Sequence, residues 1–117
     1  MIREIAFLAI SQAHQYLHWL PAALRLAARQ DVRVSVLVSS QAGHDFIKSY
    51  DLDGRLSIER LRAPSLRTHG LFNPPPRLPT LLLNAKQIAR YPTIVTTEVT
   101  SSVLRQLPGF DSTMIHL

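Results

Sequence analysis

Apolar residues along the chain fall into short continuous runs and into longer stretches with helical spacing. Residues 4–10 form a compact apolar run, and residues 33–38 form a second run that is rich in β-branched side chains. Such runs are typical of strands that are buried on both faces of a parallel sheet. Residues 93–97 and 113–117 predict two more strands. Residues 56–61 alternate apolar and polar positions, which predicts an edge strand.

Helical spacing separates these strands. Residues 13–29 carry leucine and alanine at helical intervals, with Pro21 inside the stretch. The proline implies either a kinked helix or a loose first stretch followed by a helix that begins near Pro21. Three further helices are predicted, at residues 41–50, 81–90 and 100–107. Residues 62–79, with five prolines and one glycine, predict a long loop.

This order of elements predicts an α/β fold, a Rossmann-like three-layer sandwich with a mainly parallel sheet and helices on both faces. We expect residues 1–117 to form a single Rossmann-like domain. The chain ends inside its last predicted strand. We therefore expect it to be the N-terminal fragment of a longer two-domain protein.

Composition narrows the class of protein. Hydrophobic residues make up 46% of the chain and charged residues 18%, which is a globular composition and not a disordered one. The absence of cysteine excludes a disulfide scaffold, a thiol nucleophile and a thiolate zinc site. The first apolar run is interrupted by Glu4 and ends at Ser11 without a cleavage pattern, and no stretch is long enough to span a bilayer. These features predict a cytoplasmic protein.

The net charge of +5 comes from basic residues that are scattered singly along the chain. Nucleic-acid-binding proteins gather such residues in a stripe with aromatic side chains between them, so we expect no nucleic-acid partner. A general attraction to phosphorylated ligands or to an anionic membrane surface is the alternative, and it would allow peripheral membrane association. An arginine-rich proteome would explain the charge without any partner.

Candidate chemistry lies where the predicted strands end, because open parallel sheets bind ligands at the carboxyl ends of their strands. This rule selects residues 11–14, 39–44, 96–101 and 116–117. No glycine precedes Gly43, so the glycine-rich turn of dinucleotide-binding folds is missing, and no phosphate-binding Gly-Lys-Ser/Thr occurs. No cofactor is expected on these grounds.

Ten residues in these segments are candidate site residues. The predicted catalytic residues are His14, His44 and Glu98, and the predicted substrate-binding residues are Ser11, Gln12, Gln41, Gly43, Thr97, Ser101 and His116. Residues 39–44 either offer free backbone N–H groups to an anion or form an ordinary capped helix start. Glu98 acts either as a general base or as a cap that complements the helix dipole.

Two other groups of residues are candidates for a functional site. His14 and His18 are four residues apart, and with Arg25 and Arg29 they would share one polar stripe of a helix. A hydrolytic metal site needs a third ligand and usually an intervening glutamate, so we predict no metal and a solvated role for His18. The basic residues Arg67, His69 and Arg77 of the long loop either close over an anionic substrate or are simply solvated.

Several segments resemble two-domain GT-B-type enzymes. Within residues 5–47, which resemble the N-terminal half of these enzymes, a helix carries Leu-Pro-Ala-Ala-Leu-Arg-Leu-Ala at 20–27. The segment Val-Arg-Val-Ser-Val-Leu-Val-Ser-Ser-Gln-Ala-Gly-His at 32–44 is similar to the second strand and the following turn of the UDP-N-acetylglucosamine 2-epimerase group. The segment 93–104 and the closing Met-Ile-His-Leu look more like CDP-glycerol glycerophosphotransferases. Ser11-Gln12 replaces the glycine-rich or Arg-Pro turn that often follows the first strand in that superfamily.

The resemblance implies one half of a GT-B-type architecture. It implies the acceptor-side N-terminal domain of a nucleotide-dependent glycosyl- or glycerophosphotransferase, inactive in isolation. The nucleotide-linked donor would be held by a C-terminal domain outside this chain, and the acceptor would supply a hydroxyl group. The alternatives are a non-catalytic Rossmann-like ligand-binding or protein-interaction domain and, from the charge alone, a nucleic-acid-binding module.

Overall fold

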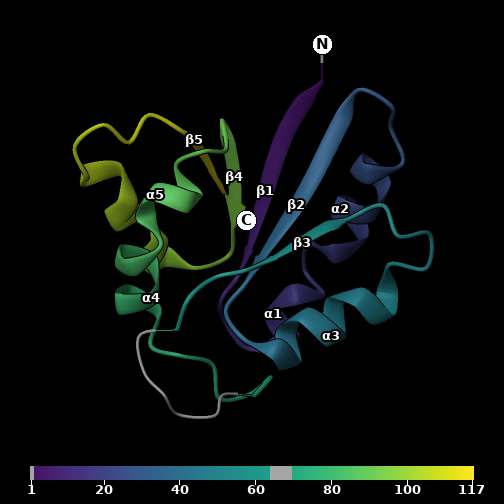
Figure 1. Cartoon of the computed structure of the whole chain (residues 1–117), viewed down its shortest axis with the longest axis horizontal. Helices are drawn as coiled ribbons and strands as arrows, with labels where there is room; N and C mark the ends of the chain where they lie inside the picture. Colours follow the sequence, from purple (N-terminus) through teal and green to yellow (C-terminus); the bar gives the residue numbers. More distant parts are fainter. Residues whose placement is uncertain (1, 64–69) are drawn as a thin grey trace.

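The computed structural model describes residues 2–63 and 70–117, and it contains one sheet of five parallel strands (Figure 1). The strands are β1 (Arg3–Ala9), β2 (Val32–Val38), β3 (Ser57–Arg60), β4 (Thr93–Thr96) and β5 (Thr113–His116). Their order across the sheet is β3-β2-β1-β4-β5. The chain therefore builds the sheet outward from β1 in one direction, then returns to the other side of β1 for β4 and β5.

Helices cover both faces of the sheet, as Figure 1 shows. The helices are α1 (Ala13–Tyr16), α2 (Leu20–Ala27), α3 (Gln41–Tyr50), α4 (Arg77–Leu83), α5 (Ala85–Ile88) and the 3₁₀ helix η1 (Val99–Gln106). One core cluster joins the sheet to α1, α2 and α3, and a second joins it to α4, α5 and η1. The predicted Rossmann-like α/β fold with helices on both faces is confirmed.

The two central strands explain why both faces need a helical layer. In β1, Phe7 and Ala9 face the first core cluster, whereas Ala6 and Leu8 face the second. The parallel register pairs Phe7 with Val36 of β2. Because successive side chains of a strand point to opposite faces, a continuous apolar run buries both.

The stretch 13–29 does not form one continuous helix. The structure has two helices, α1 and α2, with a turn between Tyr16 and Leu20, which matches the alternative of a loose first stretch. Pro21 lies in the first turn of α2, where its missing N–H has no intrahelical partner to lose. The polar stripe from His14 to Arg29 therefore does not lie on one continuous helix.

The fourth helix begins earlier than predicted. The sequence predicts a loop as far as Pro79 and one helix at residues 81–90, but α4 already begins at Arg77 and the stretch is divided at Asn84 into α4 and α5. Pro79 lies in the first turn, where prolines are tolerated, so it does not end the loop where the sequence suggested. The helix at residues 100–107 forms as η1, which has 3₁₀ geometry. All five predicted strands are confirmed to within one residue at each end, and α3 has the predicted bounds.

No helix in residues 2–63 and 70–117 is long and apolar enough to cross a membrane.

Tyr16 links the first helix to the sheet. Its hydroxyl donates a hydrogen bond to the Ala9 carbonyl at 3.1 Å, and burial raises the pKa of Tyr16 to about 12 from its usual value of 10.0. The tyrosine hydroxyl of the unfolded chain therefore ionises first as the pH rises. This group's contribution to stability is complete below pH 10 and declines by about 2 kcal/mol by pH 12.

We expect Tyr16→Phe to cost about 1 kcal/mol at neutral pH, because the buried hydrogen bond is lost. The same variant is expected to lose less stability than the unsubstituted chain between neutral pH and pH 12. Urea unfolding across this pH range, followed by circular dichroism, measures both effects. Equal pH dependence in the two proteins would contradict this role of Tyr16.

Candidate ligand-binding edge of the sheet

All five strands are parallel, so their carboxyl ends meet along one edge of the sheet. The segments that follow β3, β2, β1, β4 and β5 line this edge in that order. The order in which successive strands are added to the sheet reverses between β1 and β4, and this is the switch point where open α/β sheets bind ligands. Ser11 and Gln12 follow β1 and Glu98 follows β4, so these predicted residues flank the switch point.

Residues 70–77 cross the switch point and connect its two sides. The Ala13 backbone N–H donates to the Leu71 carbonyl at 3.0 Å, and Gln12 Nε2 donates to the Phe72 carbonyl at 3.1 Å. On the other side, the Arg77 guanidinium lies 2.9 Å from Glu98 Oε2. The segment therefore bridges the first turn after β1 and the first turn after β4.

Glu98 is held in a defined position at the start of η1. Its Oε1 accepts hydrogen bonds from the Thr100 backbone N–H at 3.2 Å and from Thr100 Oγ1 at 3.0 Å. Its Oε2 pairs with Arg77, and the side chain is only 12% exposed. Glu98 is thus the helix cap that the sequence allowed, and its second oxygen also faces a cation.

Hydroxyl groups beneath Glu98 fix the turn after β4. Thr96 Oγ1 accepts a hydrogen bond from the Glu98 backbone N–H at 2.9 Å. The buried Ser101 hydroxyl donates to the Glu98 carbonyl and lies 3.2 Å from Thr96 Oγ1. Ser101 therefore supports the backbone of the turn. Thr97 is half-buried between these residues.

The turn between β2 and α3 combines a cap with a close approach. Ser40 Oγ accepts a hydrogen bond from the Gly43 backbone N–H at 3.0 Å, so the predicted serine cap is present. A Cβ atom at Gly43 would lie 3.2 Å from Ser40 Oγ and 3.3 Å from the Tyr16 hydroxyl. Gly43 thus allows α3 to pack against α1. The neighbouring Ser39 hydroxyl is buried without a hydrogen-bond partner among the described residues.

Polar side chains at the start of α3 contact one another. Gln41 Nε2 donates to Asp45 Oδ1 at 2.9 Å, and Arg60 donates to Gln41 Oε1 at 3.0 Å. His44 Nδ1 lies 3.1 Å from Asp45 Oδ1. Hydrogen bonds from His44 and Gln41 lower the pKa of Asp45. This group lies beside β2 and β3, one strand further from the switch point than Gln12.

The other predicted histidines lie apart from this group. His14 is exposed on α1, and its Nε2 lies 3.1 Å from Gln15 Nε2. His116 is exposed at the end of β5, the strand beyond β4. Ser11 is buried directly after β1. The structure therefore connects Gln12 and Glu98 through residues 70–77. His44 and Gln41 lie one strand further along the same edge of the sheet.

Sequence reasoning gave Arg77 only as one of three basic residues of a loop. Arg67 and His69, the other two, lie outside the described residues. Thr100 and Arg60, which hold Glu98 and Gln41, were missed. A threonine two residues after an acidic helix cap is a signal that would have found Thr100.

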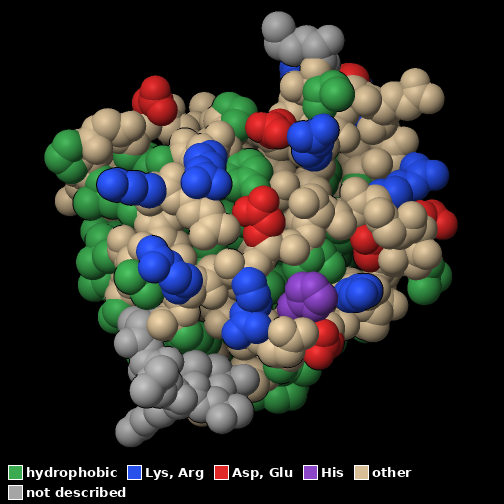
Figure 2. Space-filling model, in the orientation of Figure 1, with side chains coloured by type: hydrophobic (Ala, Val, Ile, Leu, Met, Phe, Trp, Pro, Cys, Tyr) green, Lys and Arg blue, Asp and Glu red, His purple; other side chains and the backbone are tan. Residues whose placement is uncertain are grey.

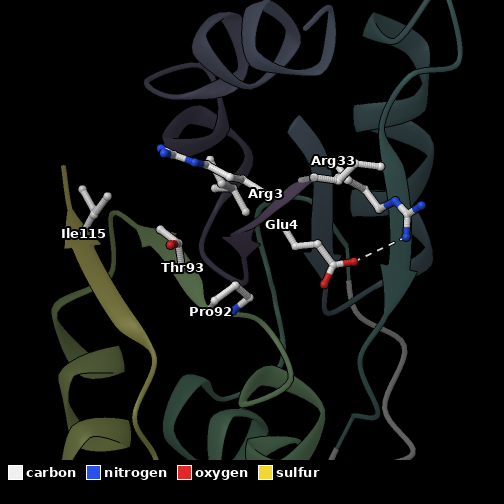
Figure 3. Close-up of a pocket in the computed structure, with 8 residues that line it drawn as sticks. Arg3, Glu4, Arg33, Pro92, Thr93 and Ile115 are labelled. Carbon is white, nitrogen blue, oxygen red and sulfur yellow. Dashed lines mark hydrogen bonds and ion pairs between the residues drawn. The ribbon is translucent and has the colours of Figure 1, made fainter. Parts of the chain in front are cut away.

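Three of the surface hollows in the described part of the chain have volumes of about 300 to 740 Å³, and none of these three is lined by one of the ten predicted site residues. The first, with a volume of about 740 Å³, lies at the amino ends of β1 and β4 (Figure 3). In Figure 3 the Glu4 side chain points toward Arg33, and its Oε1 lies 3.4 Å from a guanidinium nitrogen of Arg33. The Arg3 side chain points away from both. The other two, of about 500 and 300 Å³, lie beside α5.

Within residues 2–63 and 70–117, no three His, Cys, Asp or Glu side chains gather closely enough to hold a metal ion.

Comparisons with known proteins give no relatives. The chain matches no protein-family model, no curated protein and no solved structure. What can be said of its class is therefore its all-parallel α/β fold and the arrangement of polar residues at the switch point.

Proposed function

We propose that this chain is the acceptor-side domain of a nucleotide-dependent glycosyl- or glycerophosphotransferase of GT-B type. The observation that carries the proposal is the pairing of Glu98 with Arg77 at the switch point of the sheet. A carboxylate next to a guanidinium suits an acceptor that carries both a hydroxyl and an anionic group. The resemblance of residues 20–27, 32–44 and 93–104 to such enzymes supports the same class.

In this proposal Arg77 binds the anionic group of the acceptor. Guanidinium groups form two parallel hydrogen bonds with phosphate, which can displace a single contact with a carboxylate. Glu98 Oε2 is then released from Arg77, whereas Oε1 remains held by Thr100. The free oxygen faces the acceptor hydroxyl, and Arg77 neutralises charge beside it.

Glu98 then acts as the general base of the transfer. The acceptor oxygen forms its new bond to the sugar carbon or to phosphorus while its proton passes to the Glu98 carboxylate. The bond from the transferred group to the nucleotide breaks, and the nucleotide leaves with the electron pair. The nucleotide-linked donor binds a second domain outside these 117 residues. His44 and His14 stay the alternative bases at the same edge.

Binding to the chain itself tests this proposal. We expect sn-glycerol 3-phosphate to shift the backbone amide signals of Gln12, Glu98 and Thr100 in NMR spectra of the ¹⁵N-labelled chain. The cytidine ring signals of CDP-glycerol and the uridine ring signals of UDP-N-acetylglucosamine are expected to stay unchanged when the chain is added to either compound. Arg77→Gln is expected to weaken glycerol 3-phosphate binding by about 10- to 100-fold, because a charged hydrogen bond is lost.

Arg25→Gln is the matched control, since Arg25 is exposed on α2 and takes no part in the hydrogen bonds and the ion pair described at the switch point. It removes the same charge and is expected to leave the affinity unchanged. Shifts of the nucleotide ring signals would overturn the acceptor-side assignment, because they would put the donor in this domain. Unchanged amide signals with all three compounds would favour a non-catalytic interaction domain instead.

A further inference from the structure

The outer surface of α4 and α5 combines exposed leucines with unpaired cations. Leu78, Leu82 and Leu83 of α4 are 42, 46 and 43% exposed. Leu78 and Leu82 are four residues apart, and Lys86 continues the same spacing into α5, so these side chains follow one another along the outside of the helices. The buried side of α4 is provided by Thr80 and Leu81.

Three cations border the leucines. Arg62, Lys86 and Arg90 line the hollow of about 500 Å³ together with Leu82, Leu83 and Leu107. Lys86 and Arg90 also line the adjoining hollow of about 300 Å³, which continues to Phe110. Figure 2 shows Lys and Arg side chains interspersed with hydrophobic ones over α4 and α5. We call this set, with Leu78, the α4–α5 surface.

The cations of the α4–α5 surface have no carboxylate partner among the described residues. The nearby Glu59 carboxylate accepts a hydrogen bond from Gln87 at 3.2 Å. By contrast, Arg29, Arg33 and Arg77 elsewhere each pair with an acidic side chain. The surface therefore presents positive charge and apolar side chains together, and its three cations form no ion pair within the described residues.

We infer that the α4–α5 surface docks on a bilayer that contains anionic phospholipid. Lipid headgroups match the three cations, and the acyl region directly below the headgroups accepts exposed leucines. A nucleic-acid backbone matches the cations but leaves the leucine side chains against phosphate and sugar. This inference does not depend on the proposed transferase activity.

Vesicle binding by the whole chain tests the inference. We expect the chain to co-sediment with vesicles of phosphatidylserine and phosphatidylcholine in equal parts, and not with phosphatidylcholine alone. The triple variant Arg62→Gln, Lys86→Gln, Arg90→Gln is expected to weaken binding on the order of 100-fold, since each cation near an anionic surface contributes about a factor of five. Its control is Arg3→Gln, Arg25→Gln, Lys48→Gln, which removes the same three charges elsewhere and is expected to change binding much less.

The leucines are tested without changing charge. Leu82→Ser with Leu83→Ser is expected to weaken vesicle binding by about 10-fold, because the apolar area that enters the membrane is reduced. Leu52→Ser is the control, as Leu52 is 90% exposed in the turn after α3. Circular dichroism confirms that each variant is folded.

Three results would overturn the inference. The first is no binding to the phosphatidylserine vesicles. The second is equal weakening by the two charge variants, which would show that only net charge matters. The third combines two observations: the α4–α5 charge variant abolishes tight binding of a mixed-sequence oligonucleotide, and the leucine variant binds vesicles as well as the unsubstituted chain does. Together these would make the surface a nucleic-acid interface.

Discussion

Trp19→Ala is expected to lower the free energy of unfolding by about 3–5 kcal/mol. Trp19 is 1% exposed in the turn between α1 and α2, and its ring stacks on Phe7 of β1 with the centroids 5.1 Å apart and the planes at 24°. The Tyr16 ring also packs against Trp19, with 6.0 Å between the two ring centroids. Alanine would leave a cavity between the sheet and the helices, because the strands and α2 are fixed by other contacts.

Urea unfolding followed by circular dichroism measures this loss. Fluorescence is unsuitable, since Trp19 is the only tryptophan in the chain. Leu52→Ala is the control, because this exposed leucine is expected to change stability by less than about 0.5 kcal/mol. A loss below about 1 kcal/mol for Trp19→Ala would show that the ring is not packed as described.

Asn84→Ala is expected to cost about 3 kcal/mol. Asn84 is buried between α4 and α5, and its side chain pairs with both backbone groups of Arg62 at 2.9 Å. Its Nδ2 also donates to the Thr80 carbonyl at 2.8 Å. Alanine would leave the Arg62 N–H and carbonyl without this partner, and each such group that stays shielded from water costs about 1–3 kcal/mol. The Thr80 carbonyl keeps its hydrogen bond from the backbone N–H of residue 84.

Amide hydrogen exchange adds a local readout to urea unfolding for this variant. The Arg62 N–H is expected to exchange faster in Asn84→Ala than in the unsubstituted chain, because it loses its acceptor. Asn73→Ala, at an exposed position, is the control and is expected to leave stability and exchange unchanged. Unchanged exchange at Arg62 in Asn84→Ala would contradict the role of this side chain in fixing the segment after β3.

The class of fold could be predicted from the sequence because the signals for it are local. The apolar runs that became β1 and β2 differ from the spaced leucines that became helices, and their alternation implies a parallel sheet. Ser40 was recognisable as a cap because it precedes a helical pattern. Glu98 was recognisable as a residue between a predicted strand and a predicted helix. Both lie where the sequence indicated.

The contacts that define the candidate site could not be predicted in the same way. Gln12 bonds to Phe72, sixty residues away, and Asn84 bonds to Arg62, twenty-two residues away. Their partners are backbone groups that any residue type would supply, so no motif marks them. The pairing of Arg77 with Glu98 required α4 to begin at Arg77, whereas the prolines around it indicated a loop.

The sequence by itself thus determined the elements of this protein, their order and the edge of the sheet where ligands are expected. Only the tertiary structure decided where the first helix breaks, which charged side chains meet at the switch point, and which leucines of α4 stay outside the core. The physical reason is that periodicity depends on neighbours within one or two turns. The pairing of side chains across the switch point depends on how the sheet and the helical layers pack, and no single segment of the sequence determines that packing.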